Sequence, residues 1–301
     1  MAPPADAARE RSKPGPSSLQ KRVLSAAVLI PFVLVEIYFG HPYWDLLVAA
    51  FGGLMAWEWA RICGRRSNPA DPSPAARLPT HAMAPEALVS VAAAVAAVVL
   101  ESFPELAPGL PRGWPLVLAG VAASTAAALP RHGLRAAWFG LGTLYVATPC
   151  LAILWIRADP EAGLATMVWM LAIVIAADTG AYAAGRTIGG PKLAPRISPS
   201  KTWAGLGGAV ISAGLVGLAT AIWLDRPVIW RLAVASGALA VAEQVGDLAE
   251  SAFKRRFGVK DSSHIIPGHG GVLDRVDGLL AVTVIVAALG YLMGSSVLKW
   301  L

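Results

Sequence analysis

Repeated apolar runs constrain this chain more than any other feature of its sequence. A transmembrane helix needs roughly 20 mostly apolar residues. Nine stretches meet this requirement: 22–39, 43–60, 86–103, 114–130, 134–156, 164–184, 203–224, 229–249 and 279–298. Hydrophobic residues make up 56% of the chain and charged residues only 15%, so little sequence is left for a soluble domain. We therefore expect an all-α, polytopic integral membrane protein with about nine transmembrane helices.

The distribution of basic residues predicts how these helices are oriented. If the N-terminus is cytoplasmic, the tail and the inner loops hold every lysine and arginine except Arg112, Arg157, Arg226, Arg231 and Lys299. This bias is what the positive-inside rule predicts. We expect a protein of a bacterial-type inner membrane, with the loop 185–202 and the segment 247–278 both on the cytoplasmic face.

The segment 247–278 is the most polar part of the chain outside its ends. Because acids and bases are equal in number there, a simple basic surface is a poor description, and no nucleic-acid partner is expected. Closely spaced carboxylates and cations favour a site for metal and phosphate instead. The charged and histidine residues of this segment are Asp247, Glu250, Asp261, Asp274, Asp277, Lys254, Arg255, Arg256, Lys260, Arg275, His264 and His269.

Asp247 and Asp274 are the candidate Mg²⁺ ligands. Mg²⁺ typically takes one or two carboxylates and completes its shell with water and substrate phosphates. The two side chains would approach from the end of the eighth run and the start of the ninth. Asp277, three residues after Asp274, shares that face and could bind a second ion or orient Arg275.

Other acids in the apolar runs allow two interpretations. Glu243, Asp247 and Glu250 follow one stripe of a helix, which favours an organised polar cavity over a helix end that merely reaches water. Glu36 and Glu58 are compatible with packing or interfacial roles, or with the cavity. Asp178, among small residues that permit close helix packing, is equally compatible with a packing role and a site role.

Two loops carry candidate phosphate-binding groups. The glycines of the turn 267–271 let backbone N–H groups approach an anion, and His269 either donates to phosphate or only caps the turn. The loop 185–202 ends at the seventh run, where a helix N-terminus with hydroxyls and a lysine favours an anion. The candidates are Gly270, Gly271, Ser198, Ser200, Lys201 and Thr202, together with Lys254, Arg255 and Lys260, which could neutralise a polyphosphate or only attract lipid headgroups.

The order of these motifs resembles that of a known family. The run Ser251-x-x-Lys254-Arg255-x₄-Lys260-Asp261-x₅-Pro267-Gly268-His269-Gly270-Gly271-x-x-Asp274-Arg275-x-Asp277 is similar to the signature of the phosphatidate cytidylyltransferases, also called CDP-diacylglycerol synthases. Asp178-Thr-Gly-Ala-Tyr182, Ser198-Pro-x-Lys201-Thr202-Trp203 and Gly246-Asp247-Leu248-x-Glu250-Ser251 resemble the same family in the same order. The family usually has Lys where Ser200 stands and Glu where Ala204 stands.

The resemblance implies a membrane enzyme that joins CTP and phosphatidic acid into CDP-diacylglycerol and pyrophosphate with Mg²⁺. It also implies a homodimer, and assistance from a second ion such as K⁺. Three alternatives remain: a CTP-dependent transferase for another lipid phosphate, a secondary transporter with intramembrane acids, and a non-catalytic lipid-binding scaffold. The expected catalytic residues are Asp247, Asp274, Lys254, Asp277 and His269, and the expected substrate contacts are Ser198, Ser200, Lys201, Thr202, Arg255, Lys260, Asp261, Gly270, Gly271, Arg275 and Asp178.

Three regions are expected along the chain. Residues 1–21, rich in Ala, Pro and Ser, are predicted to be a disordered cytoplasmic tail. Residues 22–160 form N-terminal transmembrane helices, and residues 161–301 form a C-terminal catalytic transmembrane region with its site on the cytoplasmic face. Cys63 and Cys150 have neither metal nor disulfide spacing, so both are expected to be free, buried thiols.

Overall fold

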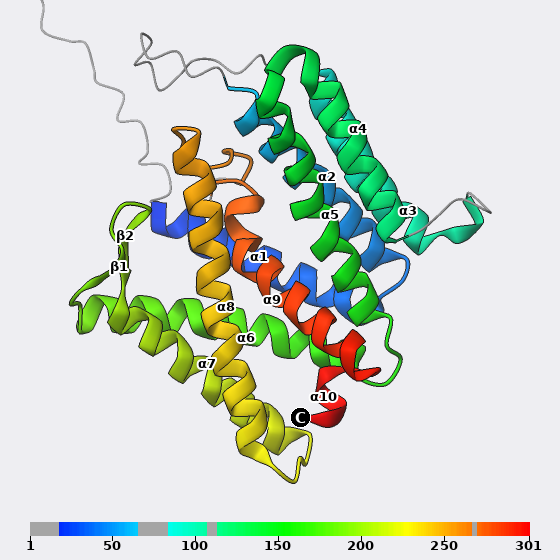
Figure 1. Cartoon of the computed structure of the whole chain (residues 1–301). Helices are drawn as coiled ribbons and strands as arrows, with labels where there is room; N and C mark the ends of the chain where they lie inside the picture. Colours follow the sequence, from blue (N-terminus) through cyan, green and yellow to red (C-terminus); the bar gives the residue numbers. More distant parts are fainter. Residues whose placement is uncertain (1–17, 66–83, 107–112, 267–269) are drawn as a thin grey trace, which may run out of the picture.

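Long helices make up most of the chain (Figure 1). The computed structural model describes residues 18–65, 84–106, 113–266 and 270–301. Each of the predicted apolar runs overlaps one of the long helices, which are α1 (Ser18–Phe39), α2 (Tyr43–Cys63), α3 (Pro85–Ser102), α4 (Trp114–His132), α5 (Ala137–Arg157), α6 (Gly163–Thr187), α7 (Trp203–Trp223), α8 (Ile229–Arg256) and α9 (Leu273–Met293). The remaining elements are the 3₁₀ turns η1 (Pro104–Leu106) and η2 (Gly133–Ala136), the strands β1 (Lys192–Ala194) and β2 (Ser198–Thr202), and α10 (Val297–Trp300).

The helices form two groups joined by α9. In one group α3 packs against α2, α4 and α5; in the other α7 packs between α6 and α8. Helix α9 contacts α8 on one side and α5 on the other, with smaller contacts to α2 and α6, as its central position in Figure 1 shows. The first residues of α9 are therefore surrounded by elements from both groups.

Small residues set the closest helix contacts. A Cβ placed on Gly180 of α6 would lie 2.5 Å from the carbonyl oxygen of Gly208 on α7, so only glycine permits this approach. Next to this contact, the Ser212 hydroxyl donates a hydrogen bond to the Ala176 carbonyl at 2.7 Å. The small neighbours of Asp178 thus serve close helix packing, as the sequence suggested.

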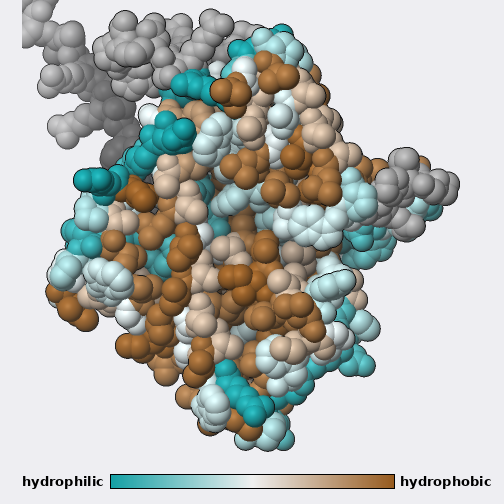
Figure 2. Space-filling model, viewed as in Figure 1, coloured by the Kyte–Doolittle hydropathy of each residue, from teal (hydrophilic) through white to brown (hydrophobic). Residues whose placement is uncertain are grey.

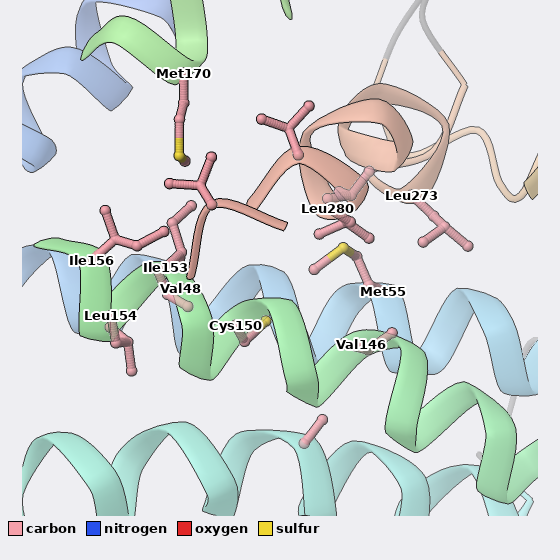
Figure 3. Close-up of a cluster of buried hydrophobic side chains, with 14 of the residues drawn as sticks. Val48, Met55, Val146, Cys150, Ile153, Leu154, Ile156, Met170, Leu273 and Leu280 are labelled. Atoms are coloured by element: carbon pink, nitrogen blue, oxygen red, sulfur yellow. The ribbon is translucent and has the colours of Figure 1, made fainter. Parts of the chain in front are cut away.

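Figure 3 shows the apolar core where α2, α5, α6 and α9 meet. Met55 of α2, Met170 of α6 and Leu273 of α9 are all at most 3% exposed. Cys150 of α5 lies in the same cluster, and both Cys150 and Cys63 are free and buried, which confirms the prediction for the two thiols.

The outer surface is strongly apolar. In Figure 2, hydrophobic residues cover much of the middle of one face, and hydrophilic residues lie mainly toward its margins. Large side chains such as Trp223 (71% exposed) and Tyr291 (78% exposed) face outward, which suits lipid rather than water. Among the described residues, seven helical segments are long and apolar enough to cross a membrane by length and composition. These features confirm a helical integral membrane protein.

The number of spans and the orientation stay predictions. One of the seven apolar segments, Trp114–Arg157, contains both α4 and α5, so these segments do not determine the number of spans. A cytoplasmic N-terminus and a total of nine spans are therefore still expectations from the sequence.

Several predicted boundaries differ from the structure, and three of them bear on the tail and the site. Residues 18–21, which the sequence assigned to the tail, belong to α1, while residues 1–17 lie outside the described part of the chain. Helix α8 continues to Arg256, past its predicted end at 249, and α9 begins at Leu273 rather than 279. The only strands among the described residues, β1 and β2, form an antiparallel hairpin before α7.

Candidate active site

Helices α8 and α9 cross at two glycines. A Cβ placed on Gly246 would lie 3.1 Å from the carbonyl oxygen of Asp277, and one on Gly278 would lie 2.7 Å from Cγ of Glu243. The two backbones therefore approach as closely as glycine allows. Asp247 and Asp277 are each the chain neighbour of one of these glycines, so the crossing brings both acids to one place.

The β1–β2 hairpin adds a lysine to this crossing. The Lys201 ammonium lies 2.6 Å from Oδ2 of Asp247, and the Asp247 side chain is 29% exposed. Ser251, one turn further along α8, donates its hydroxyl to Oδ1 of Asp247 at 3.2 Å. Thr202 fixes the end of the hairpin, because its buried hydroxyl oxygen accepts the Gly205 N–H at 3.0 Å and caps α7.

Two further acids face this ion pair. Asp178 of α6 and Glu243 of α8 interact electrostatically with each other and with Lys201 and Asp247. Glu243 is 2% exposed and also accepts a hydrogen bond from the Gln244 side-chain amide at 2.8 Å. Asp178 therefore belongs to the charged cluster, which favours the site role over simple packing.

Lys254 occupies a second, more buried part of the site. Its ammonium forms an ion pair with Glu250 one turn earlier on α8 and lies 2.6 Å from Oδ1 of Asp274 on α9. Lys254 is 7% exposed and Glu250 is 1% exposed. The sequence suggested that Lys254 neutralises a polyphosphate, but in the structure two carboxylates already surround it.

The carboxylate of Asp274 organises the loop before α9. Besides Lys254, Oδ2 of Asp274 accepts the Gly271 N–H at 2.9 Å, the Ser262 N–H at 2.9 Å and the Ser262 hydroxyl at 3.0 Å. Gly270 is required here, because its φ is +88° and a Cβ would lie 2.8 Å from Asp274 Oδ2. The Gly271 N–H, expected to approach a phosphate, is thus used within the chain.

Glu58 on α2 holds the same loop from the opposite side. This side chain is fully buried, and its carboxylate accepts four hydrogen bonds. Two come from the Val272 and Leu273 N–H groups, at 2.9 and 2.7 Å, and cap the start of α9. The others come from the Ser263 hydroxyl, at 2.5 Å, and from the Ser262 hydroxyl, whose single proton is shared between Glu58 and Asp274, each at 3.0 Å. Among the alternatives for Glu58, the structure favours membership of the polar cavity.

Aromatic side chains of α2, α5 and α8 pack together next to these polar groups. The rings of Trp59 and Phe253 stack with centroids 3.6 Å apart, and Trp59 donates its indole N–H to the Trp138 carbonyl at 2.7 Å. Tyr145 of α5 packs beside Trp59, and its buried hydroxyl has no hydrogen-bond partner among the described residues. Tyr145 interacts electrostatically with Asp277, so sequence analysis missed a residue that faces the site; an aromatic residue inside an apolar run gave no signal.

The remaining predicted contacts lie at the rim or outside the described residues. Arg255, Lys260 and Asp261 are exposed, and Arg255 donates a hydrogen bond to the Val259 carbonyl at 2.9 Å. Arg275 is exposed on the first turn of α9. Ser198 and Ser200 lie on β2, with their hydroxyl oxygens 3.5 Å apart, rather than on the helix. His269 lies in 267–269, outside the described residues.

The class of the protein follows from this arrangement: a helical integral membrane protein with a charged site where a hairpin and two glycine-crossed helices meet. The sequence profile of the Cytidylyltransferase family matches residues 20–293. The chain therefore belongs to this family.

Relatives extend along most of the chain. A protein of Brucella suis named phosphatidate cytidylyltransferase is 36% identical over 280 residues, which are 93% of this chain and 94% of the relative. A Pseudomonas aeruginosa protein of the same name is 32% identical over 282 residues, 92% of this chain and 98% of the relative. One from Haemophilus influenzae is 44% identical over 131 residues, 41% of this chain and 44% of the relative. The family named from the sequence motifs is thus confirmed.

Proposed function

We propose that this chain is a phosphatidate cytidylyltransferase, which makes CDP-diacylglycerol and pyrophosphate from CTP and phosphatidate. A phosphate oxygen of phosphatidate attacks the α-phosphorus of CTP, a new P–O bond forms, and the bond to the pyrophosphate leaving group breaks. Family membership and the names of the relatives support this reaction. The observation that carries it at the site is that Asp178, Lys201, Asp247 and Asp277, which belong to four separate motifs, form one charged cluster.

The chain's own groups suit a reaction between two anions. A phosphate dianion is already a nucleophile, so positioning and neutralising charge are the main tasks. Lys201 already supplies positive charge beside Asp247, so although its ammonium nitrogen is buried, its charge favours a phosphate that approaches this partly exposed carboxylate. At the rim, Arg255, Lys260 and Arg275 are exposed and can contact the remaining phosphate oxygens.

The donor set fits Mg²⁺ better at Asp247 than at Asp274. Asp247 is 29% exposed and pairs with Lys201 and Ser251, so an oxygen atom is accessible to an ion. Asp274 is 5% exposed and accepts from Lys254, Ser262 and Gly271, so an ion there must replace at least one of these donors. Within the described ranges, no group of three or more His, Cys, Asp or Glu residues is arranged to hold a metal ion alone, which agrees with a shell that substrate phosphates complete.

Our proposal keeps Asp247 and Asp274 as the Mg²⁺ ligands, with Asp277 beside them. Bound there, Mg²⁺ would supply the positive charge that offsets the charge developing on the phosphates. The proposal also includes a second ion such as K⁺, a homodimer, and a site on the cytoplasmic face of the inner membrane. The bias of basic residues toward one side of the chain supports that orientation.

A transfer assay in detergent tests the proposal. The purified protein is given CTP labelled at its α-phosphate with phosphatidate, an ether-linked phosphatidate analogue or an isoprenoid phosphate, with and without Mg²⁺. We expect label in the lipid and equal release of pyrophosphate with phosphatidate, and neither product from the Asp247→Asn variant. Preference for another lipid phosphate would change the substrate, and activity only in sealed vesicles would favour a transporter.

A further inference from the structure

A pocket lined by arginines lies away from the charged cluster described above. Arg65, Arg135 and Arg256, together with Trp138 and Phe257, line a cavity of about 190 Å³. The arginines come from three separate places: just after α2, within the η2 turn, and at the last residue of α8. The fold, rather than one basic run of sequence, brings them together.

Arg256 points to the other side of α8 from Lys254. Residues two apart on a helix point about 200° apart around its axis. Lys254 is buried and faces Asp274 on α9, whereas Arg256 is exposed and its guanidinium lies 5.3 Å from the ring centre of Trp138. A ligand of the arginine pocket would therefore not touch the proposed catalytic groups.

The pocket is lined by positively charged side chains and therefore favours an anion. Among the described residues, neither Arg65 nor Arg256 forms an ion pair with a carboxylate. The positive charges of Arg65 and Arg256, which line one cavity, repel each other unless an anion lies between them. Their planar forks match the oxygens of a phosphate group, to which they can donate paired hydrogen bonds.

The surroundings of the pocket favour a lipid as the source of that phosphate. All three arginines lie at the ends of apolar helices, where a membrane meets water. Leu134, the neighbour of Arg135, is 97% exposed, and Trp138 has the amphipathic character typical of the membrane interface. An apolar side chain held outward next to a phosphate-binding pocket suits an acyl chain better than a soluble anion.

We propose that Arg65, Arg135 and Arg256 bind the phosphate of an anionic phospholipid headgroup, at a site separate from the proposed nucleotidyl-transfer site. The occupant is a bilayer lipid that carries a phosphate and a net negative charge. Zwitterionic lipids bind more weakly, because their own cation competes for the same phosphate and is repelled by the arginines.

Native mass spectrometry of the detergent-purified full chain tests this site without CTP or turnover. The protein is titrated with phosphatidylglycerol, with phosphatidylcholine and with inorganic phosphate. We compare the unmodified protein with the double variant Arg65→Ala/Arg256→Ala and with Arg231→Ala, which removes an exposed arginine at the opposite end of α8. The midpoint of thermal unfolding shows that each variant is folded.

If the arginines bind the lipid, the double variant should bind phosphatidylglycerol at least about tenfold more weakly than the unmodified protein. Loss of one charge-assisted hydrogen bond raises the dissociation constant roughly tenfold. Arg231→Ala should bind it as the unmodified protein does, and Arg256→Lys should give an intermediate affinity because it keeps the charge but not the fork. Equal affinity in the double variant, or an equal loss in Arg231→Ala, overturns the site. Displacement of the lipid by an equal concentration of inorganic phosphate overturns the assignment to a lipid.

Discussion

Changing Glu58 to Gln tests whether a buried carboxylate on α2 positions the loop and helix start that hold Asp274. Each oxygen of Glu58 accepts one backbone N–H, from Val272 or Leu273, and one serine hydroxyl. Glutamine keeps the shape of the glutamate side chain, but its NH₂ group replaces one carboxylate oxygen. This NH₂ group then faces two hydrogen-bond donors, a backbone N–H and a serine O–H. Two hydrogen bonds are lost, and a buried N–H at the start of α9 is left without a partner.

The structure sets the size of the effect. A buried donor without a partner costs about 1–3 kcal/mol, and the freed serine hydroxyl can rotate to another acceptor. We therefore expect Glu58→Gln to lower the free energy of unfolding by about 1–3 kcal/mol. A loosened loop misplaces Asp274, and a misplacement of about 1 Å can reduce the rate about 100-fold. We expect kcat to fall roughly 10- to 100-fold, with KM for CTP changed much less, in a detergent assay corrected for the folded fraction.

Glu86 provides the matched control for Glu58. It is also a buried acid, 3% exposed, and accepts hydrogen bonds from Arg131 at 2.8 Å and His132 at 2.9 Å, which belong to α4 and not to the site. Glu86→Gln should cost comparable stability and leave kcat of the folded protein unchanged. If Glu58→Gln behaves like Glu86→Gln, the carboxylate only stabilises the fold; if it changes neither stability nor kcat, the hydrogen-bond argument is wrong.

Three other predictions concern the charged cluster. Asp247→Asn should lower turnover at least about 100-fold without unfolding the protein. Asp274→Asn should lower turnover and also the melting temperature, because it removes one partner of the buried Lys254. Normal turnover in either variant would contradict the assignment of these two aspartates as metal ligands. Lys201→Met should raise KM for CTP about tenfold, and an unchanged KM would exclude phosphate contact. Gly246→Ala should cost about 1–3 kcal/mol by pushing α8 from α9, whereas Gly207→Ala, with nothing within 4 Å of the added Cβ, should not destabilise the protein.

Hydropathy was sufficient to find the helices but not their polar ends. A membrane helix is visible in sequence because lipid demands apolar side chains on its surface. This signal fades where α8 and α9 turn charged side chains toward each other, so the predicted end at 249 and start at 279 fell short of the helices. Helix α9 begins at Leu273 because Glu58, 215 residues away in sequence, accepts its N–H. No local pattern near residue 273 reveals that partner.

The candidate site was predicted as a set of residues, not as a set of contacts. Asp247 stood out because charge inside an apolar run is costly, and Lys201 because it precedes a helix N-terminus that favours an anion. Their ion pair depends on where the hairpin places Lys201 against α8, which spacing alone does not determine. For the same reason Lys254 was expected to meet substrate phosphates, although the fold puts Asp274 and Glu250 on either side of it.

The two proposed metal ligands, Asp247 and Asp274, have different surroundings, which indicates that they have different roles. Asp274 is 5% exposed and is fixed by Lys254 and by N–H groups of its own loop, so its charge is already balanced before any ligand arrives. Asp247 is 29% exposed and forms an ion pair with Lys201. Substrates can therefore rearrange the partners of Asp247 at little cost, whereas those of Asp274 keep the loop in place. A site that must bring two anions together benefits from this combination, because fixed dipoles and charges need no reorganisation during reaction.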